Sequence, residues 1–373
     1  MRICRNPSKS DPKWGKYGYG GENRTRQIEE FLVSNCNIND IVEVKFGYPS
    51  SKITKIKYAL KLIFKHKFKM TFSKKIIMMS AQRYYDYIQF FNENKDIKTI
   101  FLEDPTTYIA YIAAKEAGIK VIVFIHNIET MVSTYEYDFF TKKRFPFSVV
   151  REIEFLRYAD LIYCISREEQ WLIKAFNINS VYLPYLPPSD KYEYFKGVRV
   201  KRLSINSIKP YKEFIIIGTI HYLPTLNSIH KQLDELDILS DKLNNIKVVL
   251  VGYGLEKFKI EYESKYSFLT VEGTVTPERL EELLMIVDAG LVYQDEGVGA
   301  LTKIPELLLA GVPIIANFHA ARSAHHYSGM YVYDTIEELY EYLYIDKVVP
   351  EIPEYKSVLM KKISDEIINL HVQ

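Results

Sequence analysis

The chain has 373 residues, more than one domain usually contains, and this length favours two domains. Hydrophobic residues make up 47% and charged residues 26%, so the chain can bury sizeable cores, and it has no low-complexity tract. No apolar run approaches the roughly 18 residues that cross a bilayer, and the start, MRICRNPSKS, lacks the apolar core of a signal peptide. The three cysteines have no metal-binding spacing and fit a reducing compartment. We therefore expect a cytoplasmic protein, either free or attached to the cytosolic face of a membrane.

Positive charge is concentrated in one stretch of the sequence. Between Lys45 and Tyr85 there are ten lysines and Arg83 but no acidic residue, which gives +11. The whole chain carries +2, so the remainder carries −9 (2 − 11). This separation indicates a face that meets an anionic partner. The stretch has no nucleic-acid-binding motif, and we expect no nucleic-acid partner.

The chain opens with a short expected strand, Arg2–Arg5, and a glycine-rich loop. A helix is expected from about Asn23 to Val33. Gly20 and Gly21 precede it, and backbone N–H groups at the start of a helix can cradle a phosphate. A flexible loop is an equally good interpretation of the two glycines.

The basic stretch has the period of a helix. Its lysines surround one apolar face, which consists of Ile53, Ile56, Leu60, Ile63 and Phe64. One interpretation is a solvated surface helix. We slightly favour a second, in which residues 45–83 lie on an anionic membrane surface, because apolar burial and cationic attraction then act together.

Alternating strands and helices follow. Strands are expected at Thr99–Leu102 and Lys120–Ile125, with a helix at about Thr106–Ala117 between them. The second strand ends in the sequence His126-Asn127-Ile128-Glu129. Ligands bind beyond the carboxyl ends of parallel strands, so His126 is a candidate catalytic residue. Its alternative role is a structural cap on the strand.

A proline-rich stretch divides the chain. Pro184, Pro187 and Pro188, followed by polar residues as far as Pro210, interrupt all periodicity. The predicted domains are an N-terminal domain over residues 1–184, a linker over 185–212, a C-terminal domain over 213–350, and a last helix over 351–373 that crosses back.

The second half repeats the order of strand, glycine turn and helix. The expected strand Glu213–Ile217 ends in Gly218-Thr219, and the expected strand Lys247–Val251 ends in Gly252. A helix is expected at Pro277–Met285.

The segment Asp288–Asn317 is the most informative part of the sequence. A hydrophobic run leads into a glycine-bearing loop, and a helix and a second hydrophobic run follow, as in one βαβ unit of a parallel sheet. Gly297 and Gly299 let backbone N–H groups approach a ligand closely. Lys303 can meet a phosphate, and Glu306 can accept hydrogen bonds from a diol. A lone GxG is weak evidence, and a lysine or glutamate in a first helical turn is often only a solvated charge. Together, these residues suggest a nucleotide site.

The order GxG, Lys303, Glu306, Gly311 and Pro313 resembles the donor-nucleotide motif of GT-B glycosyltransferases, particularly the large retaining family 4. The resemblance implies an α/β fold with two Rossmann-like domains facing a cleft and a C-terminal helix packing back on the first domain. It places Glu306 on the ribose and Lys303 on the diphosphate. His126 would contact the transferred sugar or the acceptor, which makes these three the expected catalytic residues.

The same resemblance implies a set of positions that hold the nucleotide sugar. One departure concerns Val298, which stands where many members have a first glutamate, with Glu296 two residues earlier. The expected binding positions are Gly20, Gly21, Gly218, Thr219, Gly252, Glu296, Gly297, Val298, Gly299, Ala300, Leu301 and Thr302.

The implied function is transfer of a sugar, with retention, from a nucleotide-diphosphate donor to a saccharide or lipid-linked saccharide in glycan or polysaccharide biosynthesis. We favour a UDP-linked donor over a GDP-linked one, and we expect no metal or other cofactor. Two alternatives stay open: a sugar-nucleotide 2-epimerase of the same fold, and a non-catalytic glycosyltransferase-like partner protein.

Overall fold

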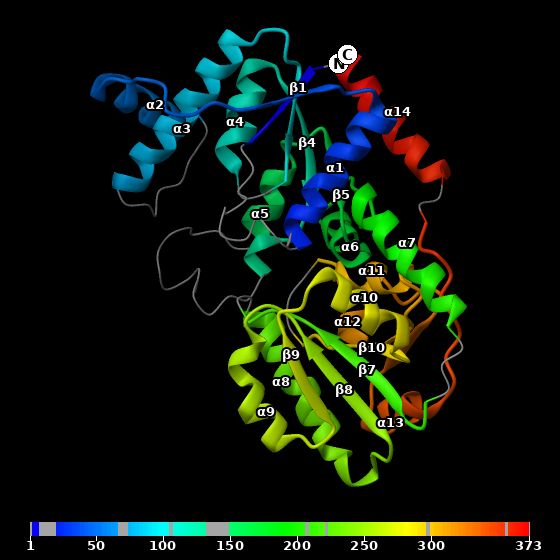
Figure 1. The fold of residues 1–373 in the computed structure, drawn as a ribbon. Helices are drawn as coiled ribbons and strands as arrows, with labels where there is room; N and C mark the ends of the chain where they lie inside the picture. Colours follow the sequence, from blue (N-terminus) through cyan, green and yellow to red (C-terminus); the bar gives the residue numbers. More distant parts are fainter. Residues whose placement is uncertain are drawn as a thin grey trace. The chain divides into compact units, whose positions relative to one another are not determined.

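The computed structural model describes residues 2–6, 20–65, 74–103, 107–131, 149–205, 209–220, 223–295, 299–354 and 357–372. The chain forms two compact units, which Figure 1 draws in the colours of the sequence. Unit 1 comprises Met1–Val132, Tyr137–Pro184 and Tyr355–Gln373, and the main body of unit 2 is Tyr185–Glu354.

Unit 1 is built on a six-stranded sheet in the order β2-β1-β3-β4-β5-β6. Every strand pair of this sheet is parallel. The order reverses between β1 and β3, because β2 lies on one side of β1 while β3 to β6 continue on the other. The strands are β1 (Arg2–Arg5), β2 (Asp40–Glu43), β3 (Thr99–Leu102), β4 (Lys120–Ile125), β5 (Leu161–Cys164) and β6 (Val181–Tyr182).

Helices cover both faces of this sheet, and alternate residues of β4 show why. Val121, Val123 and Ile125 pack on one face, and Ile122 and Phe124 pack on the other. A parallel strand that is buried on both faces reads as a continuous apolar run, as KVIVFI does. The first face is covered by α2 (Lys52–Phe64), α3 (Lys74–Glu93), α4 (Tyr108–Ala117), α5 (Val149–Leu156) and α6 (Arg167–Ala175), and the second by α1 (Gly20–Cys36) and α14 (Ser357–Val372).

The C-terminal helix packs on unit 1, as expected. Met360, Ile363 and Ile367 of α14 are buried in one core cluster with residues of α1. The hydroxyl of Ser364 donates to the carbonyl of Asn35 at the end of α1 (2.5 Å). The last helix therefore completes the core that the first strand begins.

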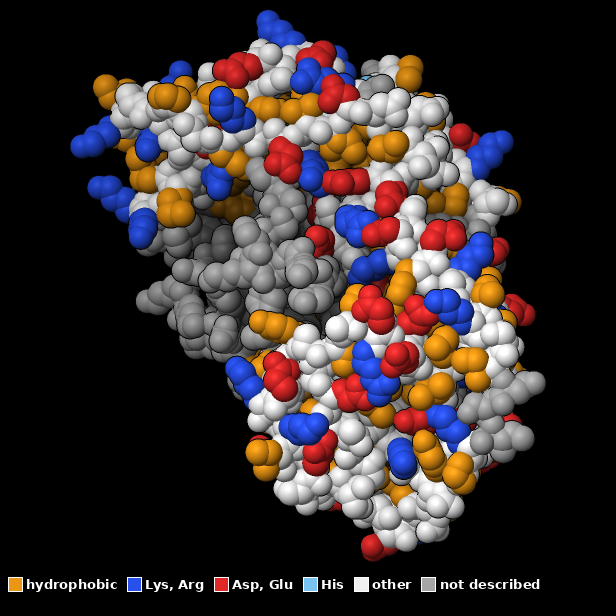
Figure 2. All heavy atoms as spheres, in the orientation of Figure 1, with side chains coloured by type: hydrophobic (Ala, Val, Ile, Leu, Met, Phe, Trp, Pro, Cys, Tyr) orange, Lys and Arg blue, Asp and Glu red, His pale blue; other side chains and the backbone are white. Residues whose placement is uncertain are grey.

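The basic stretch contains α2, whose two sides differ in burial. Ala59 and Leu62 are buried against the core of unit 1, and Ile63 is partly buried with them. The four other apolar residues of the expected face are largely exposed: Ile53 (79%), Ile56 (51%), Leu60 (48%) and Phe64 (76%). Lys61 pairs with Glu116, which Lys65 also contacts at 3.2 Å. Figure 2 shows Lys and Arg side chains beside hydrophobic ones on unit 1.

No helix among the described residues is long and apolar enough to cross a membrane.

Unit 2 is built on a second six-stranded parallel sheet, in the order β12-β11-β10-β7-β8-β9. The chain winds from β7 to β9 in one direction and from β10 to β12 in the other, so the order reverses between β7 and β10. The strands are β7 (Lys212–Ile217), β8 (Ile246–Val251), β9 (Leu269–Gly273), β10 (Ala289–Val292), β11 (Ile314–Asn317) and β12 (Met330–Tyr333).

Two core clusters lie on the two faces of this sheet. Phe214 and Ile216 of β7 belong to one cluster, and Ile215 belongs to the other. The first face is covered by α8 (Leu223–Ile238), α9 (Lys259–Lys265) and α13 (Ile336–Tyr344), and the second by α7 (Ser189–Ser204), α10 (Pro277–Ile286), α11 (Lys303–Leu309) and α12 (Phe318–Ala321). In the part of the chain that the structure describes, short 3-10 turns occur at Glu129–Met131 (η1) in unit 1 and at Ser240–Lys242 (η2) and Leu255–Phe258 (η3) in unit 2.

Helix α7 corrects the expectation of a linker over 185–212. It packs on α10 and α11, and its Phe195 and Val198 are buried in the second core cluster of unit 2. The sequence of this helix shows only a weak apolar periodicity, because only these two of its residues are fully buried. Polar contacts add to this packing: Arg199 donates to the carbonyl of Leu308 (3.3 Å), and Arg202 donates to those of Gly311 (3.0 Å) and Leu284 (2.7 Å).

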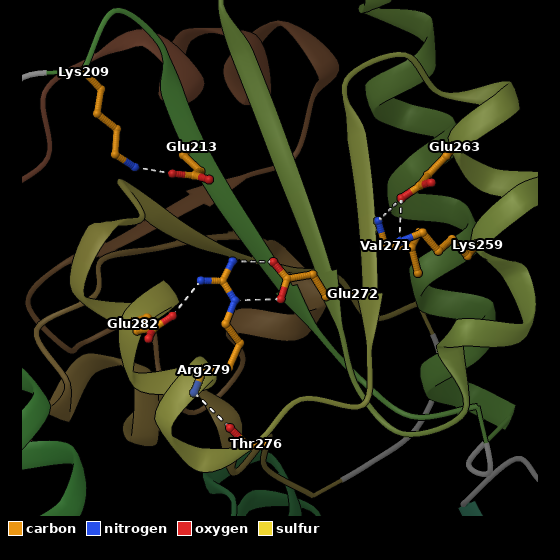
Figure 3. Close-up of polar contacts among 9 residues, drawn as sticks. All are labelled: Lys209, Glu213, Lys259, Glu263, Val271, Glu272, Thr276, Arg279 and Glu282. Atoms are coloured by element: carbon orange, nitrogen blue, oxygen red, sulfur yellow. Dashed lines mark hydrogen bonds and ion pairs between the residues drawn. The ribbon is translucent and has the colours of Figure 1, made fainter.

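The outer edge of the second sheet is protected by charged side chains. Strand β9 lies at this edge, and the backbone N–H of Val271 donates to Glu263 of α9 (2.8 Å). Arg279 of α10 forms a two-pronged contact with Glu272 of the same strand (2.9 and 2.7 Å) (Figure 3). Such contacts discourage pairing of an edge strand with another chain.

Candidate nucleotide site

The candidate site of unit 2 lies where the strand order reverses. Helix α11 follows β10, and β7 is the strand beside β10 in the sheet. In open parallel sheets, ligands bind beyond the carboxyl ends of the strands at this switch point. The fold thus brings the turn after β7 and the loop after β10 to the same edge.

Lys303 and Glu306 lie on the first turn of α11, and both side chains are partly buried. The ammonium group of Lys303 donates to the carbonyl of Ile217, the last residue of β7, over 2.7 Å. Glu306 accepts a hydrogen bond from the hydroxyl of Tyr185 at its Oε1 atom (2.8 Å). Two groups expected at a ligand are thus fixed by partners inside unit 2.

The surroundings shift the pKa values of both groups. Burial lowers the pKa of Lys303 to about 8, although the nearby charge of Glu306 opposes this shift. Burial raises the pKa of Glu306, against the opposing effects of Lys191, the Tyr185 hydroxyl and Lys303. Each charge is held in a poorly solvated place, where interaction with a ligand of opposite charge or a hydrogen-bond donor is strengthened.

The loop before α11 is described from Gly299 onward; the expected site residues Glu296, Gly297 and Val298 lie outside the described residues. Gly299 has φ of 79°, a conformation that favours glycine, and its carbonyl accepts a hydrogen bond from Nε of Arg322 (3.1 Å). Ala300 follows it. Leu301 packs partly against the core, and Thr302 stands at the N-cap of α11 without a side-chain capping bond.

Gly218 and Gly252 end β7 and β8, and their role in the structure is close backbone packing. A Cβ atom on Gly252, whose φ is 146°, would lie 1.5 Å from the carbonyl oxygen of Gly218. Gly218 itself leaves no room for a side chain beside Ile229 and Thr225. Thr219, next in the turn, contacts the carbonyl of Tyr253 through its hydroxyl (3.4 Å). The glycines shape the turns of the site whether or not a ligand touches them.

A second polar group lies in unit 1, also at the point where its strand order reverses. His126 follows β4, and its Nε2 atom lies 3.1 Å from the carboxylate of Glu103, which follows β3. The hydroxyl of Thr25 on α1 donates to the same carboxylate and lies 3.2 Å from the carbonyl of Gly21. The structure thus brings the expected residues Gly21 and His126 to one group of side chains, and Gly20 begins α1 beside them.

The environment keeps Glu103 ionised. Burial raises the pKa of this carboxyl, but His126, Thr25 and Arg5 outweigh burial and leave the pKa below its usual value. A carboxylate beside an imidazole can fix the orientation of the ring. The loop after His126 is fixed in turn, because Glu152 accepts the backbone N–H groups of Glu129 and Thr130 (both 2.8 Å).

Sequence reasoning missed Glu103, Tyr185 and Lys191. Glu103 carries the same signal as His126, a polar residue directly after an apolar strand. The other two carry no local signal, since they reach Glu306 only through the packing of α7 on α11.

Among the described residues, no group of three or more His, Cys, Asp or Glu side chains is arranged to hold a metal ion.

The sequence matches no protein-family model, and no curated protein matches it. Solved structures do match. HepE of Anabaena in complex with UDP is 12% identical and has a TM-score of 0.57, with 100% of this chain and 98% of that chain covered. The complex of HepE with UDP-glucose is 13% identical, with a TM-score of 0.55 over 100% and 94% of the two chains.

Sucrose-phosphate synthase from Thermosynechococcus elongatus is 11% identical, with a TM-score of 0.53 over 100% of this chain and 91% of that chain. These neighbours are GT-B glycosyltransferases, so the resemblance at the level of the GT-B fold is confirmed. The chain has an α/β fold of two Rossmann-like units, as expected. Assignment to family 4 stays a prediction.

The close approach of Gly218 and Gly252 predicts that a larger residue at position 252 destabilises the fold. Gly252→Ala should lower the free energy of unfolding by about 1–3 kcal/mol, since the new methyl group forces the two turns apart and φ is unsuited to alanine. Gly197→Ala is the control: it lies inside α7, where nothing is within 4 Å of the new Cβ, and should be neutral or slightly stabilising. Denaturant titration measures both, and a Gly252→Ala variant as stable as the wild type would contradict the close packing of the two turns.

Proposed function

We propose that the protein is a nucleotide-sugar-dependent glycosyltransferase, which moves a sugar from a nucleotide-diphosphate donor to a saccharide or lipid-linked saccharide acceptor. The observation that carries the proposal is the placement of Lys303 and Glu306 on the first turn of α11, at the switch point of unit 2. The fold supports it, because HepE, which has the same fold, is described in complex with UDP and with UDP-glucose. We favour UDP as the nucleotide for the same reason.

The proposed roles follow from the chemistry of the two side chains. A carboxylate can accept hydrogen bonds from two adjacent hydroxyls, which fits Glu306 to the ribose of a nucleotide. As the bond between the sugar and the diphosphate breaks, negative charge grows on the departing diphosphate. Lys303 can stabilise that charge, and a preorganised cation in a poorly solvated place does so effectively. Retention of configuration is our proposal from the resemblance to family 4, and the anomeric configuration of the product, read by NMR, tests it.

Ligand binding tests the nucleotide site. We expect UDP or a UDP-sugar to raise the melting temperature in a screen that includes GDP, ADP and their sugars, because a ligand of the folded state stabilises it by mass action. Glu306→Gln should weaken binding of that nucleotide by about 1–3 kcal/mol through loss of charge-assisted hydrogen bonds. Glu261→Gln, an exposed carboxylate on α9, is the matched control. Equal affinity in wild type and Glu306→Gln would remove Glu306 from the site.

His126 and Glu103 generate a second test. His126→Ala should lower kcat by roughly 10²-fold with little change in donor affinity, if the imidazole acts on the sugar or the acceptor. Glu103→Gln should lower kcat less, and should add nothing in the His126→Ala background, because Glu103 acts through the ring. Near-wild-type turnover in His126→Ala would make His126 a structural cap of β4.

Two other functions fit the same fold and have separate tests. An epimerase would convert a UDP-sugar without any acceptor, so incubation with donor alone distinguishes it from a transferase. A non-catalytic partner protein need not bind a nucleoside diphosphate, so the binding screen distinguishes that function too.

We further propose that α2 attaches the enzyme to an anionic membrane, which would bring it to a lipid-linked acceptor. Ile53, Ile56, Leu60 and Phe64 form an exposed stripe along this helix. Lys52 and Lys57 are exposed on the same helix, and no acidic residue occurs in it. Apolar insertion and attraction to anionic headgroups act together on such a surface.

Vesicle sedimentation tests this attachment. The protein should bind anionic but not neutral vesicles, and salt should weaken the binding. Lys52→Glu with Lys57→Glu should reduce it, since each lysine near the surface contributes about 1 kcal/mol. Ile53→Ser with Leu60→Ser should also reduce it, whereas Ile260→Ser, at a residue 88% exposed on α9, should not. Failure to bind anionic vesicles at low salt would favour a soluble acceptor.

A further inference from the structure

The short segment before α7 reaches the candidate nucleotide site. Tyr185 is only 3% exposed, and its hydroxyl donates to Oε1 of Glu306 over 2.8 Å. The charge of Lys191, on the first turn of α7, lowers the pKa of the same carboxyl group against the effect of burial. Two residues of a segment that reads as a linker therefore converge on the glutamate that the proposed function places on the ribose.

Tyr185 is held in place on unit 2 by the residues that come after it in the chain. Leu186, Pro187 and Pro188 are buried, and the proline rings fix two backbone torsions on the way into the helix. Helix α7 then packs along α11, the helix that carries Glu306. The hydroxyl of Tyr185 is therefore held in a fixed position beside the carboxylate of Glu306.

The chain before Tyr185 is held as well. Within unit 1, Arg24 of α1 donates to the carbonyls of Leu183 (2.8 Å) and Pro184 (3.2 Å), and Gln27 donates to that of Pro184 (3.0 Å). Arg24 itself is buried, with 1% of its surface exposed. Tyr185 is thus the first residue after a firmly bound stretch of backbone.

We propose that Tyr185 is a positioning residue of the donor-nucleotide site, which holds the carboxylate of Glu306 ready to receive the two hydroxyls of a ribose. The inference rests on the proposed function. A carboxylate has about four lone-pair sites on its two oxygens. Tyr185 occupies one site on Oε1, so the diol is received at Oε2 and at the second site of Oε1. Because the side chain is ordered before the ligand arrives, less conformational freedom is lost on binding.

Tyr185→Phe removes only the hydroxyl and keeps the ring. On the full chain, we expect the dissociation constant for UDP, measured by isothermal titration calorimetry, to rise by up to about tenfold, because a carboxylate that is not held beforehand loses more conformational freedom on binding. Tyr194→Phe is the matched control. This residue lies on α7 itself, and its hydroxyl donates to the carbonyl of Pro277 (2.9 Å), so its loss should leave UDP affinity unchanged.

The pH dependence of UDP binding distinguishes a role of Tyr185 in positioning Glu306 from a role in packing alone. Binding that needs the carboxylate is lost as the pH falls through the pKa of Glu306. The Tyr185 hydroxyl is one of the contacts that lower this pKa against the effect of burial, so Tyr185→Phe should lose UDP at a higher pH than the wild type does. Lys191→Gln should move the midpoint in the same direction, and it provides a second variant at a site less buried than Tyr185.

A double-mutant cycle completes the test. In the Glu306→Gln background, Tyr185→Phe should not weaken UDP binding further, because the residue acts through the carboxylate. If Glu306→Gln weakens UDP binding while Tyr185→Phe leaves both the affinity and the pH midpoint unchanged, the positioning role is overturned and the nucleotide site stands. If the wild type binds none of the nucleoside diphosphates, the proposed function is overturned, and this inference with it.

Discussion

Parallel pairing of the strands is the constraint on which the rest of the structure depends. In the described residues, every strand pair of both sheets is parallel, so all carboxyl ends of one sheet fall on one edge. Each connection must then return across a face, which explains why helices cover both faces and why strands inside the sheets, such as β4 and β8, are largely apolar. Where the strand order reverses, the returning helices diverge and leave the strand ends accessible. At this point of unit 2, Lys303 of α11 donates a hydrogen bond to the last residue of β7. At the corresponding point of unit 1, Glu103 follows β3.

The parts of the structure that could be predicted from the sequence are those with a strong local signal. Strand β4 follows from an unbroken apolar run, and the helix after β5 follows from Ser166, whose hydroxyl accepts the N–H of Glu169 (3.1 Å) as an N-cap. Helix α7 could not be predicted in the same way, because prolines precede it and only two of its residues, Phe195 and Val198, are buried, too few to form an apolar stripe. Tyr185 escaped notice for a related reason: its partner is 121 positions away in the sequence, and only the tertiary fold brings the two together.

The two candidate glutamates have opposite relations to stability. The pKa of Glu103 is lowered, so this residue stabilises the fold above its unfolded pKa, and the contribution is lost as the pH falls through the folded pKa. The pKa of Glu306 is raised, so its contribution is present at low pH and is lost as the pH rises through the folded value. The fold therefore tolerates on α11 a carboxyl group whose ionised form is poorly solvated. Such a residue is typical of a place selected for binding at some expense of stability.

The path of the chain through unit 1 has a consequence for synthesis on the ribosome. Met360, Ile363 and Ile367 fill a core that they share with residues of α1 and of strands β1, β3, β4 and β5. Unit 2 is complete in sequence once residue 354 has been made, whereas unit 1 must wait for α14. Chains grow at about 5–20 residues per second, and domains generally fold as units. The second unit to be translated can therefore finish folding first, while the exposed second face of the first sheet waits for its last helix.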